Sequence, residues 1–221
     1  MSDIKLFPLY LTFKVASLAT ILSCTVGLSL AWILARKQFF GKSFVDVLIM
    51  QPLVIPPTVL GYYLLVLLGR ASPVGKFLEQ AFGLTLVFTW KGAVIAANVA
   101  SMPLFIRPAK AAIENIDANL ENAARLLGKS EWEVFCTITL PLAKRGILAG
   151  TILAFARAMG DFGTTLMVAG NIPGKTQTLS LAIYDAVQAD NIGLANILVL
   201  IMTGFSIAVL WTVNRCTHGR Y

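Results

Sequence analysis

Charged residues are scarce in this chain of 221 residues: Asp, Glu, Lys and Arg make up 13% of it, about half of their share in an ordinary soluble domain. Hydrophobic residues reach 57%, and the few charges leave long apolar runs almost untouched. A water-soluble globule and an intrinsically disordered chain are therefore excluded. The composition predicts an all-α protein, a bundle of helices that crosses a membrane several times.

Cysteine and histidine are also rare. Cys24, Cys136 and Cys216 lie far apart in the sequence and form no CxxC pair, and His218 is the one histidine. A disulfide-stapled secreted module is therefore excluded, and we expect free thiols. Ligands this few and this scattered also predict no zinc or haem site.

Five apolar runs are long enough to cross a bilayer as helices, which takes about twenty residues each. We expect the first to remain as a helix and not to be cleaved as a signal peptide, because it is long and Arg36 and Lys37 follow it. A further short helix, TLSLAIYDAVQA, is expected within residues 176–190 and would make a sixth span if it crossed. The chain is thus predicted to be one transmembrane domain over residues 1–221, with spans at 10–35, 47–69, 84–106, 146–170 and 191–214.

Basic residues indicate the orientation of these spans. Eleven of the 18 Lys and Arg residues fall on one side of the predicted spans and four on the other. Since positive charge collects on the cytoplasmic side, we expect the N-terminus outside and the C-terminus inside. The bases lie between apolar segments and not on one polar face, so nucleic acid is not an expected partner.

The predicted cytoplasmic loop, residues 107–145, contains a short amphipathic helix. Asp117 or Asn119 can cap its start, and Gly128 suits the position just past its end. Ser130 and Glu133 then form a capping box that begins a second helix, which Leu140-Pro141 is expected to interrupt or bend. Apolar residues recur at the spacing of one helix face at Leu120, Ala123, Ala124 and Leu127.

This small apolar face has two interpretations. Two alanines and two leucines suit insertion into a groove on a partner protein better than adsorption to a membrane. The same spacing also fits an ordinary surface helix packed on its own bundle. Spacing alone leaves both open.

The loop resembles the EAA loop of ABC importer permeases, and the run LENAARLLGKSEWEVFCTITLPLAKRGILAGTILAFARAMGDFG is similar to that of the molybdate permeases among them. The resemblance implies that the loop docks into a cytoplasmic ABC ATPase, which uses ATP and magnesium, and that a periplasmic oxyanion-binding protein delivers the cargo at a bacterial inner membrane. It implies that Glu121 meets the ATPase surface and that two alanines allow close approach. The residues that carry it are Glu121, Ala123, Ala124, Gly128, Leu140 and Pro141.

Two runs come close to a phosphate-binding loop, and neither qualifies. FFGKS ends correctly, but Arg36 occupies the place of the first glycine, and GNIPGKT has three intervening residues instead of four. We therefore expect a separate chain to hydrolyse ATP, and this chain to bind no cofactor and to be no enzyme by itself.

Five helices from one chain are few for enclosing a channel, so we expect a homodimer with the pathway on its two-fold axis. Arg157 and Asp161 stand at i, i+4; a structural ion pair is the preferred interpretation and contact with an anion the alternative. The residues expected along the path are Pro56, Pro57, Arg157, Asp161, Thr164, Thr165 and Asn171.

The predicted cargo is a tetrahedral oxyanion, molybdate first and tungstate or sulfate as alternatives. An ATP-independent channel or secondary transporter is the alternative from another class.

Overall fold

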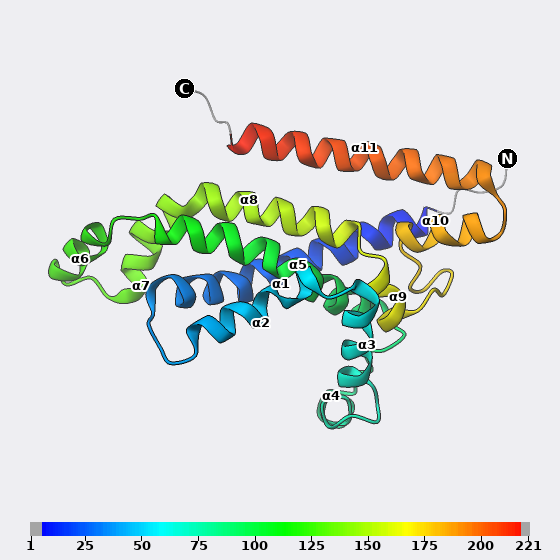
Figure 1. Ribbon diagram of the computed structural model, residues 1–221, viewed down its shortest axis with the longest axis horizontal. Helices are drawn as coiled ribbons and strands as arrows, with labels where there is room; N and C mark the ends of the chain where they lie inside the picture. The colour runs from blue at the N-terminus through cyan, green and yellow to red at the C-terminus, as the bar shows by residue number, and fades with distance from the viewer. Residues whose placement is uncertain (1–5, 218–221) are drawn as a thin grey trace.

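The computed structural model describes residues 6–217, so His218 lies outside its range, as does the side chain of Cys216. Within that range the chain is built of helices joined by short connections (Figure 1). In chain order these are α1 (Phe7–Arg36), α2 (Lys42–Val54), α3 (Pro57–Leu68), α4 (Pro73–Phe82), α5 (Trp90–Glu114), α6 (Ala118–Leu126), α7 (Glu131–Val134), the π-helix η1 (Phe135–Thr139), α8 (Leu140–Met159), α9 (Gly163–Ala169), α10 (Leu179–Gln188) and α11 (Ile192–Thr217).

Helices α1, α5 and α8 form the centre of the bundle and run side by side along its long axis (Figure 1). Small residues line their contacts, which lets the backbones approach closely in an environment where lipid gives no hydrophobic drive for association. At Gly150 of α8 an added Cβ would lie 2.7 Å from the Phe105 carbonyl oxygen of α5, and at Gly27 of α1 it would lie 2.7 Å from the Phe105 ring. Close packing around Phe105 therefore depends on these two glycines.

Four segments are long and apolar enough to cross a membrane, and α2 with α3 makes a fifth if the pair counts as one span. The span predicted over 47–69 is broken in the structure, because α2 and α3 meet at an angle of 116°. They have 13 and 12 residues, about 20 Å each, too short to cross a core of about 30 Å. The break between α2 and α3 is caused by Pro56-Pro57. The two prolines remove backbone hydrogen-bond donors and hold Ile55 extended, with ψ at 136°.

Two other spans differ from their predicted bounds. Helix α5 begins at Trp90, six residues later than expected, and continues to Glu114, so it includes the first eight residues of the predicted loop 107–145. The span predicted over 146–170 ends at Met159, where a break separates α8 from α9.

Leu140-Pro141 does not interrupt the helix that precedes α8, since Glu131–Met159 forms one continuous segment. The π-helix η1 ends directly before Leu140, and Pro141 stands in the first turn of α8. In an unbroken α-helix the proline ring would clash with the carbonyl group four residues earlier. The wider turn of η1 removes that conflict.

Helix α10 is the short helix expected within residues 176–190. Its ten residues extend about 15 Å, half of the hydrocarbon core, so the six-span alternative is excluded. The Leu179 amide donates to Thr12 Oγ1 of α1 at 2.7 Å. Helix α10 therefore packs beside the first turns of α1, at the end of the bundle opposite α6 (Figure 1).

Candidate functional site

Helix α6 and the turn into α7 extend beyond the bundle at one end (Figure 1). The Asn119 amide donates to Asp117 Oδ1 at 2.9 Å, which makes Asp117 the cap. Gly128 ends the helix with φ at +82°, a value that glycine adopts easily. The predicted helix, its cap and its glycine turn are confirmed.

The predicted capping box that begins α7 is also confirmed. The Glu133 amide donates to Ser130 Oγ at 3.3 Å, and the Ser130 amide donates to Glu133 Oε2 at 2.8 Å. Arg125 of α6 contacts Glu131 of α7 across the turn, with Nε 2.6 Å from Oε1. This hydrogen bond to Glu131 raises the pKa of the Arg125 guanidinium, so its charge persists. The turn between α6 and α7 is therefore fixed by the capping box and by the ion pair that crosses it.

The apolar side chains of α6 are largely uncovered by the rest of the chain. Leu126 is 89% exposed, Leu127 82% and Leu120 49%, whereas Ala124 is 5% exposed and faces inward. A helix packed on its own bundle would bury its leucines. The exposed leucines therefore favour a partner protein over the alternative of an ordinary surface helix.

The structure corrects the expected position of Glu121, which is 2% exposed and faces into its own chain. Arg36 at the end of α1 holds this carboxylate, with Nε 3.0 Å from Oε2 and Nη2 3.1 Å from Oε1. Thr139 Oγ1 of η1 donates to the same group at 2.7 Å. A buried carboxylate needs such partners, and Glu121 consequently ties α6 to α1 and η1.

Arg36 and Thr139 are partners of Glu121 that the sequence reasoning missed. Arg36 lies 85 positions from Glu121 in the sequence, and nothing local indicates that they pair. Lys110 of α5 likewise pairs with Asp46 of α2 at 2.7 Å. Only one feature of the sequence hints at these ion pairs, which is that single charges stand at the ends of apolar spans.

Residues predicted for the translocation path gather at the break between α8 and α9. Arg157 Nη1 lies 3.1 Å from Asp161 Oδ1, so the predicted i, i+4 pair is present, although Asp161 stands past the end of α8. Asp161 Oδ2 accepts from the Thr165 amide at 2.9 Å and from Thr165 Oγ1 at 2.7 Å. Both carboxylate oxygens are thus satisfied within the chain, as the structural ion pair predicts.

The proline break packs against the same region. A Cβ at Gly163 of α9 would lie 3.0 Å from Pro57 Cβ, and Pro56 is exposed beside it. Thr164 Oγ1 is buried and has no hydrogen-bond partner among residues 6–217. Asn171 lies apart from this cluster, with Nδ2 3.4 Å from Asp185 Oδ1 of α10.

A helical membrane bundle with a broken span and a capped helix projecting from one end has the architecture of ABC importer permeases. The crystal structure of a bacterial ABC transporter involved in import of the acidic polysaccharide alginate has a similar fold. The TM-score is 0.76 at 15% identity, over 99% of this chain and 80% of that one.

The family described as binding-protein-dependent transport system inner membrane component matches residues 25–215, and the chain belongs to it. It is thus the polytopic inner-membrane subunit of an importer that works with an ATPase and a substrate-binding protein. The molybdenum transport system permease protein of Haemophilus influenzae is 49% identical over 178 residues, 80% of this chain and 78% of that protein. A sulfate transport system permease protein of Synechococcus elongatus is 36% identical over 200 residues, 90% and 70% of the two chains.

Proposed function

We propose that this chain is the permease of an ATP-driven importer whose cargo is molybdate. The relative named for molybdenum transport is 49% identical, against 36% for the one named for sulfate. Molybdate, tungstate and sulfate are all divalent tetrahedral anions, so the residues at the α8–α9 break do not separate them. Permeases for tungstate or sulfate are therefore the alternatives within the class.

The observation that carries this proposal is the projecting helix α6, with its leucines uncovered and its one buried acid anchored inward. We assign α6 to a groove on the cytoplasmic ATPase, which binds ATP and magnesium in its own chain. Leu126 and Leu127 enter the groove, and Gly128 allows the close turn. Leu140 and Pro141 join the coupling segment to α8.

The anchors of α6 explain how motion of the ATPase reaches the membrane. The carboxylate of Glu121 joins α6 to α1 through Arg36 and to η1 through Thr139. Because η1 runs directly into α8, a displacement of α6 moves two of the three central helices. Ala123 is exposed on the outer side of α6 and leaves room for the partner to approach.

In the proposed orientation the α6 end and the C-terminus face the cytoplasm, and the N-terminus and α10 face the periplasm. Eleven of the 18 Lys and Arg residues fall in the segments predicted to be cytoplasmic and four in those predicted to be outside, and this count supports the orientation. The binding protein delivers the anion at the α10 end.

A second copy of the chain completes the pathway in this proposal. The break between α2 and α3 leaves Pro56, Pro57 and Thr58 exposed, and irregular backbone at membrane depth needs cover from protein or water. A two-fold axis beside this break would place it against the partner and along the path.

An ATP-independent channel or secondary transporter remains the alternative from another class. It predicts uptake into liposomes that contain this chain alone. It gives no role to the exposed leucines of α6.

Gly128 provides the test of coupling. Replacing Gly128 by valine places a β-branched residue at φ +82°, and we expect ATP-driven molybdate uptake to fall about tenfold because the turn is strained by about 1–2 kcal/mol. Uptake is measured in proteoliposomes that contain the ATPase and the binding protein. An added Cβ there meets nothing within 4 Å, so the effect is one of backbone conformation alone.

Gly128→Asn is the matched control, because asparagine tolerates the left-handed conformation. It should retain most of the uptake. Wild-type uptake by Gly128→Val, or uptake without ATP, would contradict the proposed coupling. Equal transport of sulfate and molybdate would contradict only the assignment of molybdate as the cargo.

A further inference from the structure

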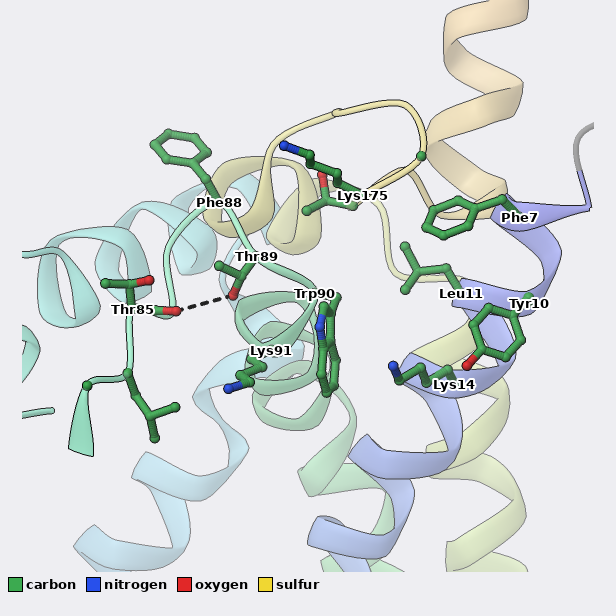
Figure 2. Close-up of a pocket in the computed structure, with 14 residues that line it drawn as sticks. Phe7, Tyr10, Leu11, Lys14, Thr85, Phe88, Thr89, Trp90, Lys91 and Lys175 are labelled. Atoms are coloured by element: carbon green, nitrogen blue, oxygen red, sulfur yellow. Dashed lines mark hydrogen bonds between the residues drawn. The ribbon is translucent and has the colours of Figure 1, made fainter. Parts of the chain in front are cut away.

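A cavity of about 470 Å³ opens at the α10 end of the bundle. It lies between α1, the connection that leads into α5, and the loop that leads into α10 (Figure 2). Three lysines line it: Lys14 of α1, Lys91 in the first turn of α5, and Lys175 of the loop that leads into α10. Neither the coupling site nor the proposed path uses them.

The positive charge of this cavity is uncompensated within the described chain. No carboxylate is among its lining residues, and within residues 6–217 none of the three lysines forms an ion pair. Arg70, lining the neighbouring cavity, differs in that its Nε lies 3.4 Å from Glu79 Oε1. The start of α5, at Trp90 and Lys91, adds the positive end of a 25-residue helix dipole. The cavity therefore attracts an anion.

Aromatic rings share the cavity with the lysines. Lys14 Nζ lies 3.8 Å from the centroid of the Trp90 ring, a cation–π contact. Tyr10 and Phe88 also line the cavity and are each 60% exposed. Aromatic and basic side chains together are typical of the depth where lipid headgroups meet acyl chains.

The position of Lys14 fits this depth. It stands seven residues after the start of α1 at Phe7, about 10 Å along the helix axis, so its ammonium can extend toward the interface. The lining residues include none of the path residues at the α3 and α9 break. The cavity is therefore built from other residues than the proposed route of the cargo.

We propose that this cavity binds the phosphate of an anionic phospholipid headgroup. Lys14, Lys91 and Lys175 supply positive charge around the headgroup, and Tyr10, which lies beside Lys14 (Figure 2), packs on the glycerol and upper acyl carbons. The recognised group is a tetrahedral oxyanion, chemistry that the free cargo shares. The site requires only a membrane-spanning chain, so it does not depend on the proposed cargo or coupling.

The test measures lipid binding to the purified full-length chain by native mass spectrometry. We expect short-chain phosphatidylglycerol to bind at least about tenfold more tightly than phosphatidylcholine of the same chain length, because each basic residue near the headgroup contributes about 1 kcal/mol. The variant Lys14→Gln/Lys91→Gln/Lys175→Gln should lose this preference. Lys76→Gln, an exposed lysine of α4 outside the cavity, is the matched control and should keep it.

Three outcomes would overturn the proposal. An unchanged preference for phosphatidylglycerol in the triple variant would show that the lysines do not hold the lipid. Displacement of phosphatidylglycerol by micromolar free molybdate would assign the cavity to the cargo. A triple variant with normal lipid binding but without stimulation by the binding protein would assign it to an acidic protein surface.

Discussion

Replacing Glu121 with lysine is expected to lower ATP-driven uptake at least about tenfold while the permease still inserts in the membrane. The new ammonium would face the Arg36 guanidinium, which now lies 3.0 Å from the carboxylate, and Thr139 would lose its acceptor. Breaking a buried ion pair by removing one partner costs about 3–5 kcal/mol, enough to detach α6 from α1 and η1. Uptake in proteoliposomes and the ATPase rate of the assembled transporter measure the loss.

Arg125→Gln is the matched control for this variant. It removes the ion pair to Glu131, in which both side chains are partly exposed, and a longer contact of 3.9 Å to Glu121 Oε2. Exposed pairs contribute only about 0–1 kcal/mol. We expect uptake within about twofold of wild type, since the coupling geometry does not rest on an exposed pair. Equal defects in Glu121→Lys and Arg125→Gln would contradict a special role for the buried anchor.

Replacing Gly150 with valine is expected to reduce the amount of folded permease most severely. The added Cβ would lie 2.7 Å from the Phe105 carbonyl oxygen and 3.3 Å from Phe105 Cα. These are backbone atoms that cannot rotate away, so α5 and α8 must separate. We expect a loss of at least about 1–3 kcal/mol, the usual cost of overpacking. Thermal unfolding of the purified chain followed by near-UV circular dichroism measures it.

Gly204→Val separates packing from the general cost of a β-branched residue in a membrane helix. A Cβ at Gly204 of α11 meets nothing within 4 Å, so this variant should unfold close to the wild-type temperature. If the two valine variants unfold at the same temperature, close packing at Gly150 is not what holds α5 to α8.

Local signals made helix α6 and the turn after it predictable. Asp117, Gly128 and the Ser130–Glu133 box each act within a few residues, and the structure places all of them as expected. The direction of Glu121 was not predictable in this way, because its partner Arg36 is 85 residues away. Whether an acid on a short helix faces in or out is decided by tertiary packing.

The membrane spans show the same difference between features set by local sequence and features set by tertiary packing. Hydropathy located the apolar segments, and Pro56 and Pro57 stand inside the one predicted over 47–69. The 116° angle depends on how α3 packs against α9, which no local pattern reports. Leu140-Pro141 does not interrupt the helical segment Glu131–Met159 because η1 accommodates the proline, and a π-helix has no reliable signature in one sequence.

The lysines of the α10-end cavity were visible in the sequence only as isolated charges. Lys14 and Lys91 interrupt apolar spans, and Lys175 stands in a loop that resembles a phosphate-binding motif. Their convergence on one cavity requires α1, α5 and the loop before α10 to meet at one end of the bundle. That meeting is a property of the fold and not of any one segment.

Site-specific photo-crosslinking tests most directly whether α6 couples the ATPase to the membrane bundle. The crosslinker replaces Leu127, 82% exposed on the turn after α6, or Val187, 53% exposed on α10 at the other end of the bundle. The account predicts a crosslink to the ATPase subunit from position 127 and none from position 187. A crosslink to the ATPase from position 187, or none from position 127 in an actively transporting complex, would contradict it.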